Sequence, residues 1–265
     1  MPALSKHRLL SALEEIGDYL RMLGNLCTAT WKRPPPWALV REQLFHIGVL
    51  SLFVVAITGF TTGFVLAAQS FYQLGEKGLS AITGVLVGKA MITELGPILT
   101  AFMVTGRVGS AMCAELGSMR VTEQIDAMRS MAVSPNAYLV APRVLAGTLM
   151  VPLLTLFSVL MGIFGGFLIA TLLFNMPPSS YFDPMRLHIT LFDVASGLLK
   201  SLLFGFLLVT VCCYKGMRAS GGAAGVGKAT TQSVVTSYIL ILMSDFLLTL
   251  GLNIINQELK YNWMQ

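Results

Sequence analysis

Long apolar segments alternate with shorter polar connections along most of the chain. About 20 consecutive apolar residues form a helix long enough to cross the hydrocarbon core of a membrane. The apolar segments run from about Leu44 to Tyr72, Leu79 to Thr105, Val144 to Phe174, Leu191 to Tyr214 and Ser233 to Ile255. The pattern therefore predicts an all-α integral membrane bundle of about five transmembrane helices.

The first 40 residues follow a different pattern. Apolar residues recur at helical spacing between Leu9 and Cys27, while charged residues occupy the other faces, which predicts an amphipathic helix. A Pro-rich stretch between Trp31 and Trp37 ends this helix. We expect residues 1–40 to form an interfacial helix with a Pro-rich re-entry and residues 41–265 to form the transmembrane domain. A water-exposed helix without a packing role is the alternative for the first segment.

The composition agrees with a chain that is mostly embedded in lipid. Hydrophobic residues make up 55% of it, charged residues 12%, and the mean hydropathy is +0.73; a soluble domain has about 25% charged residues. The net charge of +5 does not indicate nucleic-acid binding, because no basic stripe with interleaved aromatic residues is present. The 4 cysteines have neither metal-ligand spacing nor the arrangement of a disulfide framework. We expect no metal site.

Lysine and arginine residues are distributed unevenly between the two sides of the predicted membrane. One side receives Lys6, Arg8, Arg21, Lys32, Arg33, Arg41, Arg107, Arg120, Arg129, Arg143, Lys215, Arg218 and Lys228, and the other receives Lys77, Arg186 and Lys260. Because basic residues accumulate on the cytoplasmic side of membrane proteins, this asymmetry predicts a cytoplasmic N-terminus and, after five spans, a C-terminus on the opposite, periplasmic side.

Ionisable residues inside the predicted spans are candidates for function, because a charge in the bilayer is costly without a partner or a wet cavity. Glu94 precedes Gly96 and Pro97, which weaken the helix and free backbone polar groups there. Lys200 and Asp245 lie near the middle of their spans. One interpretation is a cavity whose cations hold an anionic headgroup; the other is that Glu94 and Lys200 neutralise each other as a structural pair. Lys89 and Asp193 are expected to point outward.

Two glycine patterns carry less weight. The first has the spacing of close helix contacts in lipid, within a bundle or between copies, and comprises Gly59 and Gly63, Gly84 and Gly88, and Gly162, Gly165 and Gly166.

The second is a partial match to a nucleotide-binding phosphate loop. Residues 222–229 fit that motif up to Ala229, where a Ser or Thr belongs. Since no strand is predicted before this segment, we expect a flexible turn leading into the last span, and no catalytic site in the chain.

The longest polar connection lies between the second and third spans. Its charged and amide residues are Glu115, Arg120, Glu123, Gln124 and Asp126. The segment is too short and too charged to cross a membrane, so we expect a helix of about residues 108–131 that docks onto another protein.

Several motifs together resemble the MlaE/YrbE permease family of ABC transporters. They are ELGP from Glu94 to Pro97, the stretch from Gly106 to Met128, Pro142-Arg143, and Lys200-Ser201. The resemblance extends from about Leu44 to Leu250, and its central motif is long and specific.

This resemblance implies a homodimeric permease that moves phospholipid between the inner and outer membranes of a bacterium. Separate cytoplasmic ABC ATPase subunits, which carry the ATP and magnesium, would drive it, and an MCE-domain protein would join it on the outer side. The segment from Glu115 to Asp126 would be the ATPase-coupling helix, with Glu115, Arg120, Glu123, Gln124 and Asp126 as its contacts. Lipid would bind at the dimer interface between the first, second and fifth spans, to Glu94, Lys200, Gln69, Phe71 and Tyr72.

One departure from the family pattern concerns the headgroup. An arginine often precedes the glutamate of ELGP, but Thr93 occupies that position here. Either the headgroup depends more on Lys200, or the substrate is less anionic than a typical phospholipid. Alternatives to phospholipid transport are a sterol or another hydrophobic cargo, an ion-coupled secondary transporter that uses Glu94 and Asp245, and a membrane scaffold without transport.

Overall fold

The computed structural model describes residues 2–32, 34–76 and 79–263, so Arg33 and Lys77 lie outside the described residues. Every regular element within those ranges is a helix. Helical stretches long and apolar enough to span a membrane cover Trp37–Gly75, Ser80–Val121, Asn136–Leu172, Leu191–Met217 and Gly222–Glu258. The predicted all-α bundle with 5 membrane-spanning helices is confirmed.

The spans are built from the following elements. The first contains α2 (Trp37–Ile47) and α3 (Leu52–Gly75), and the second contains α4 (Thr83–Ala90), a π-helical turn (Met91–Leu95), α5 (Gly96–Val104), another π-helical turn (Thr105–Gly109) and α6 (Ser110–Val121). The third is α8 (Ala141–Leu172) after a π-helical turn (Asn136–Val140), the fourth is α10 (Leu191–Met217), and the last is α11 (Gly222–Trp263). Outside the spans lie α1 (Pro2–Lys32), α7 (Gln124–Ser130) and α9 (Pro178–His188).

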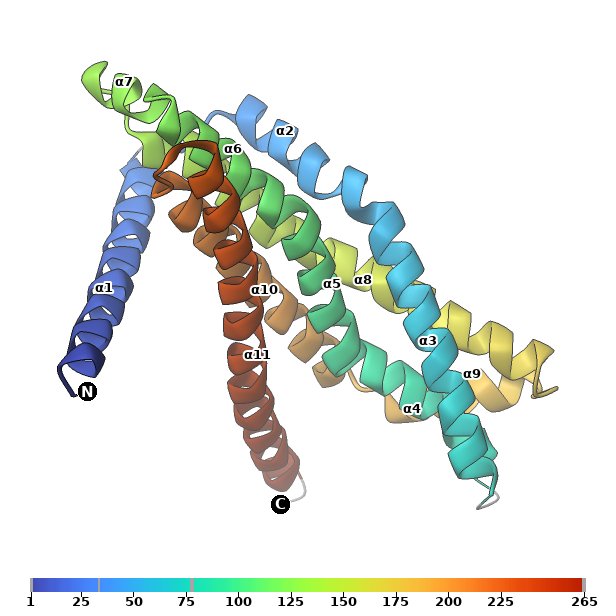
Figure 1. Ribbon diagram of the computed structural model, residues 1–265. Coiled ribbons are helices and arrows are strands. Elements are labelled where there is room, and N and C mark those ends of the chain that lie inside the picture. Colours follow the sequence, from blue (N-terminus) through green and yellow to red (C-terminus); the bar gives the residue numbers. More distant parts are fainter. Residues whose placement is uncertain (1, 33, 77–78, 264–265) are drawn as a thin grey trace.

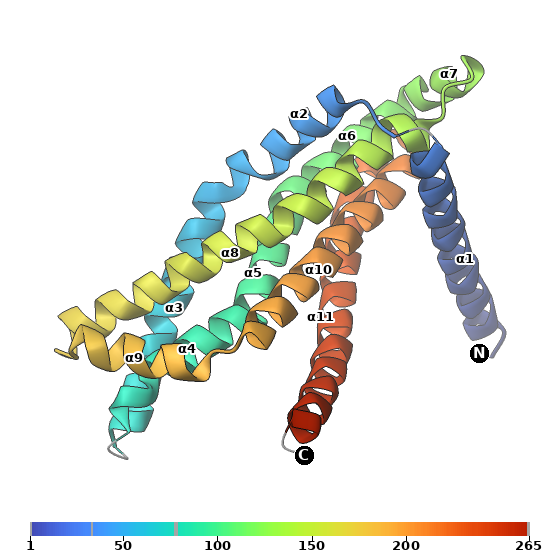
Figure 2. The ribbon, with the colours of Figure 1, turned by 180° about the vertical axis from the view of Figure 1, so that it is seen from behind.

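Helix α8 lies at the centre of the bundle, in contact with α3 on one side and α10 on the other (Figures 1 and 2). The contact with α3 depends on small residues. A Cβ atom at Gly63 would overlap the carbonyl group of Gly162, and one at Gly59 would overlap Ser158. The glycine spacing found in the sequence therefore serves helix packing within one chain.

Helix α1 stands apart from the spans. It meets the rest of the molecule near α7 and the end of α10 and then extends away from the bundle (Figures 1 and 2). Its position in the membrane interface stays a prediction.

The connection between the second and third spans differs from the single helix predicted for residues 108–131. The second span continues as α6 to Val121, Glu123 then adopts a left-handed backbone (φ 60°), and α7 begins at Gln124. The break turns Ile125 into the core, where its side chain is fully buried. Because glutamate favours helices, the sequence pattern shows no break at this position.

The predicted flexible turn at residues 222–229 is also wrong. Left-handed backbone at Gly221 (φ 89°) and Gly222 (φ 68°) makes a short turn after α10, and α11 begins at Gly222. The small residues of the segment are compatible with a helix, and α10 rather than a strand precedes it. The context of a phosphate loop is therefore missing.

Candidate functional site

Lys200 is the centre of a charge cluster between α10, α11 and the π-helical turn of the second span. Its ammonium nitrogen lies 2.7 Å from Glu94 Oε2 and 3.0 Å from Asp245 Oδ1. It also donates hydrogen bonds to Thr249 Oγ1 at 2.7 Å and to the backbone carbonyl of Thr93 at 3.0 Å. The Lys200 side chain is only 2% exposed. A lysine buried to this degree is compatible with the bilayer because its charge is fully partnered.

The Thr93 carbonyl is available to Lys200 for a reason that lies in the sequence. In an α-helix this oxygen would accept the N–H of the residue four positions later, which is Pro97. Proline has no N–H, and Gly96 bonds instead to Met91 in a π-helical turn. The expectation that Gly96 and Pro97 free backbone polar groups is confirmed at Thr93.

A second ion pair extends the cluster toward the N-terminal end of α10. Lys89 Nζ lies 3.6 Å from Asp193 Oδ1. The prediction that Asp193 points outward is wrong, because its side chain is only 7% exposed. Asp193 accepts hydrogen bonds from the backbone N–H and the hydroxyl of Thr190, which places its carboxylate at the N-terminus of α10. Lys89 is half-exposed, as expected.

A cavity of about 200 Å³ opens onto this cluster. Its lining combines the charged residues with amide and hydroxyl groups: Lys89, Thr93, Glu94, Phe192, Asp193, Ser196, Lys200, Thr249, Leu252, Asn253 and Asn256. Because Lys200 is buried among its partners, the most accessible charged groups of the lining are the Lys89 ammonium and the Glu94 carboxylate, which is 36% exposed. The cavity can therefore hold a zwitterionic group, or a polar group that hydrogen-bonds to both Lys89 and Glu94.

The remaining predicted lipid contacts lie elsewhere in the chain. Gln69 lines a separate groove on α3, together with Leu95 of the second span. The Phe71 ring stacks on Phe174 with centroids 3.9 Å apart, and Tyr72 packs against the edge of Phe174. The structure of one chain therefore does not bring these three residues to the charge cluster.

The predicted coupling residues divide into two groups. Glu115 pairs with Arg143 at the start of α8, at 3.0 Å, and so connects two spans. Arg120 donates to Asp126 at 2.6 Å across the break between α6 and α7. This hydrogen bond is the main cause that lowers the pKa of Asp126 below its ordinary value.

Glu123 and Gln124 form the exposed corner of the same segment. Glu123 occupies the break itself, and the Gln124 side-chain amide donates to Thr122 Oγ1 at 3.1 Å. The structure thus holds a folded, exposed polar corner on the second span, fixed by buried Ile125 and by the contact between Arg120 and Asp126.

Sequence reasoning missed Thr249 and the Thr93 carbonyl as members of the charge cluster. Thr249 lies four residues after Asp245, and a helix places such residues on one face. A hydroxyl at this spacing from Asp245 therefore indicates a possible partner for the same charge cluster. The Thr93 oxygen follows from the position of Pro97, but its pairing with Lys200 requires knowing that α10 lies beside the π-helical turn.

Together these features define a class of protein: a multi-pass α-helical membrane protein with a partnered charge cluster between its spans and a folded polar corner at one end. Comparison with known families identifies the family to which the chain belongs. Residues 40–250 match the family described as Permease MlaE, and the chain belongs to that family.

Individual relatives agree with the family match. A probable ABC transporter permease protein of Rickettsia bellii is 41% identical over 91% of this chain and 93% of its own length. The intermembrane phospholipid transport system permease protein MlaE of Haemophilus influenzae is 31% identical over 91% of this chain and 95% of its own. The chloroplastic protein TRIGALACTOSYLDIACYLGLYCEROL 1 of Arabidopsis thaliana is 34% identical over 80% of this chain and 61% of its own. The chain is therefore a permease subunit of an ABC transporter.

Proposed function

We propose that this permease moves phospholipid between two membranes. The observation that carries the proposal is the similarity, over 91% of the chain, to a permease of Haemophilus influenzae whose name gives that activity. The charge cluster supports a substrate with a polar headgroup, because the accessible cation Lys89 and the carboxylate Glu94 line one cavity. A phospholipid headgroup, zwitterionic or anionic, carries a phosphate that can pair with the Lys89 ammonium.

The transporter works as a homodimer in the bacterial inner membrane. Its partners are cytoplasmic ATPase subunits, which bind ATP and magnesium, and an MCE-domain protein on the outer side. The N-terminus is cytoplasmic and the C-terminus periplasmic, as the distribution of lysine and arginine predicts. In the dimer, the Gln69 groove and the charge cluster form parts of one lipid pathway, together with Phe71 and Tyr72.

The polar corner between α6 and α7 couples the permease to the ATPase. Glu123 and Gln124 are exposed and available to a partner, while Arg120 and Asp126 hold the corner in shape. ATP binding would draw the ATPase subunits together and carry the corner with them. A lipid cargo can respond only through different affinities for the two resulting states, so it must bind the open pocket better than the closed one.

Purification of the whole complex in mild detergent tests the proposal. We expect the ATPase and an MCE-domain protein to co-purify with the wild-type chain, together with phospholipid identified by mass spectrometry. E123A should lose the ATPase or its transport-linked hydrolysis, whereas E42A, at an exposed glutamate of α2, should not. A sterol in place of phospholipid would reject the substrate, and unchanged coupling in E123A would reject the role of the corner.

An ion-coupled mechanism is the second candidate, based on Glu94 and Asp245. Membership in an ABC permease family weighs against it. Transport by the purified chain without ATP or an ATPase would favour it.

A further inference from the structure

A second polar hollow lies at the cytoplasmic end of the molecule, well away from the charge cluster. It has a volume of about 210 Å³ and lies between α1, α7 and the end of α10. Arg21 and Asn25 come from α1, Arg129 from α7, and Met217 and Arg218 from α10 and its end. Met217 is 17 positions after Lys200, or roughly 26 Å along a helix. The two sites are therefore separate.

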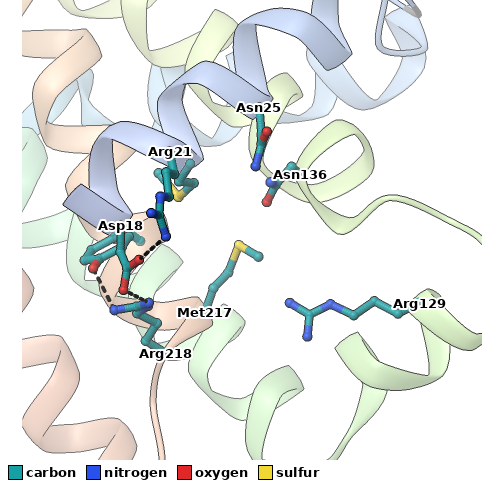
Figure 3. A pocket seen from close by; sticks show the side chains of 9 residues that line it. Asp18, Arg21, Asn25, Arg129, Asn136, Met217 and Arg218 are labelled. Carbon is teal, nitrogen blue, oxygen red and sulfur yellow. Dashed lines mark hydrogen bonds and ion pairs between the residues drawn. The ribbon is translucent and has the colours of Figure 1, made fainter. Parts of the chain in front are cut away.

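Four arginines surround this hollow and the one adjoining it. The adjoining hollow, of about 470 Å³, shares Arg129, Met217 and Arg218 and adds Arg120. Figure 3 shows the Arg129 side chain extending toward Met217 from one side, with Arg21, Asp18 and Arg218 on the opposite side and Asn25 close to Asn136. Donor groups from different elements thus surround one space.

The arginines are only partly neutralised. Arg218 donates to Asp18 at 2.5 Å and to the Tyr214 hydroxyl at 2.8 Å, and Arg129 donates to Asp126 at 3.0 Å. Asp126 also accepts from Arg120, and Asp18 lies 3.8 Å from Arg21. Each guanidinium has five N–H donors, so these contacts leave several free. The first hollow, the arginine hollow, is lined by three arginines and one carboxylate, Asp18. Its net positive charge is suited to a phosphate.

An apolar groove lies on the other side of the contact between α1 and α10. It has a volume of about 500 Å³ and is bordered by Ile16 and Leu20 of α1, Val211 of α10 and Leu240 of α11. Tyr214 lines both this groove and the arginine hollow, and its ring packs against that of Tyr19 with centroids 5.4 Å apart. The arginine hollow therefore adjoins an apolar groove wide enough for an acyl chain.

We propose that the arginine hollow binds the phosphate of an acidic phospholipid from the cytoplasmic leaflet, with an acyl chain in the groove beside α1. Basic pockets at the cytoplasmic ends of membrane helices bind acidic headgroups in this way. The apolar groove favours lipid over an acidic side chain of the ATPase, because one lipid molecule carries both a phosphate for the hollow and an acyl chain for the groove beside it. This site is distinct from the transport pocket and holds α1 beside the coupling corner.

The test uses the full-length chain, purified, delipidated and re-equilibrated with phosphatidylglycerol or phosphatidylcholine, and measures retained lipid by native mass spectrometry. R21Q and R129Q are the test variants, because both side chains are more than half exposed and tolerate replacement. R41Q is the control, since Arg41 is an exposed arginine on the same predicted side. We expect phosphatidylglycerol retention to fall about fivefold for each test variant and to stay unchanged in R41Q.

Three results would overturn the proposal. One is unchanged phosphatidylglycerol retention in R21Q and R129Q. If these variants also fail to co-purify with the ATPase, the hollow is a contact site for the ATPase instead. Another is equal retention of phosphatidylcholine and phosphatidylglycerol by the wild type, with retention of both lipids falling equally in R21Q and R129Q, because the site would then not select an acidic headgroup. The third is thermal stabilisation of the wild type by inorganic phosphate as strong as that by phosphatidylglycerol, which would indicate a site for a soluble anion.

Discussion

At the scale of single residues, Lys200 shows how a membrane protein keeps a charge in its interior. Two carboxylates, a hydroxyl and a backbone carbonyl surround its ammonium group. These contacts connect α10 to α11 and to the second span. The cluster thus has a structural role in addition to its proposed role in lipid binding.

Removal of this ammonium should be strongly destabilising. In K200M, Glu94 and Asp245 would face each other without a cation, which costs about 3–5 kcal/mol for a buried pair. Thermal unfolding in detergent measures the change. K89M is the control, because its half-exposed ammonium contributes at most about 1 kcal/mol. A K200M variant as stable as K89M would mean that the cluster is hydrated and carries little structural weight.

The contact between Arg120 and Asp126 has a defined pH dependence. Arg120 lowers the pKa of Asp126, so the ionised, paired form is favoured in the folded chain. The stabilisation is present above the ordinary carboxylate pKa and is lost as the pH falls through the lowered value. The difference in thermal stability between wild type and D126N should therefore stay constant from neutral to mildly acidic pH. A difference that already disappears near pH 6 would contradict this assignment.

At the scale of elements, the sequence predicts the spans well because each depends on a long local property. Twenty apolar residues are visible without knowing any neighbour. The break at Glu123 is different, since it accompanies the burial of Ile125 against other elements. The inward position of Asp193 depends partly on Lys89 of another span, although Thr190, three residues earlier, is a local partner. Glu94 and Lys200 were predicted as a possible pair, whereas Gln69, Phe71 and Tyr72 came from the family resemblance and lie away from them within one chain.

The close contact between α3 and α8 predicts a sharp response at Gly63. In G63A the new methyl group would overlap the Gly162 carbonyl, so the helices must separate, at a cost of about 1–3 kcal/mol. G227A is the matched control, because a Cβ atom at Gly227 meets no atom within 4 Å. It should be neutral or slightly stabilising in a helix. Equal melting temperatures for both variants would show that the contact is not tight.

At the scale of the whole molecule, α11 is the least covered span. Only 6% of its most apolar window is buried within the chain, and Phe246 and Leu247 are 63% and 66% exposed. The same helix carries Asp245 and Thr249 of the charge cluster. We therefore expect the second copy in the proposed dimer, rather than lipid alone, to cover this face.

Cross-linking tests this placement. In a background with exposed Cys27 replaced by serine, L247C should form a disulfide between copies under mild oxidation, because the remaining cysteines are buried. L153C on α8 is the control, since Leu153 is 56% exposed on a different helix. Dimers from L153C but not from L247C would place the interface on α8 instead.

The bond between Thr93 and Lys200 changes how a proline in a membrane helix is understood. Pro97 is itself apolar, yet it gives the second span an unsatisfied oxygen that a cation from another helix can use. A designer who replaced Pro97 with alanine to straighten the helix would remove that oxygen from the lysine without touching any charged side chain. An apolar residue can in this way set where a membrane protein keeps its ions.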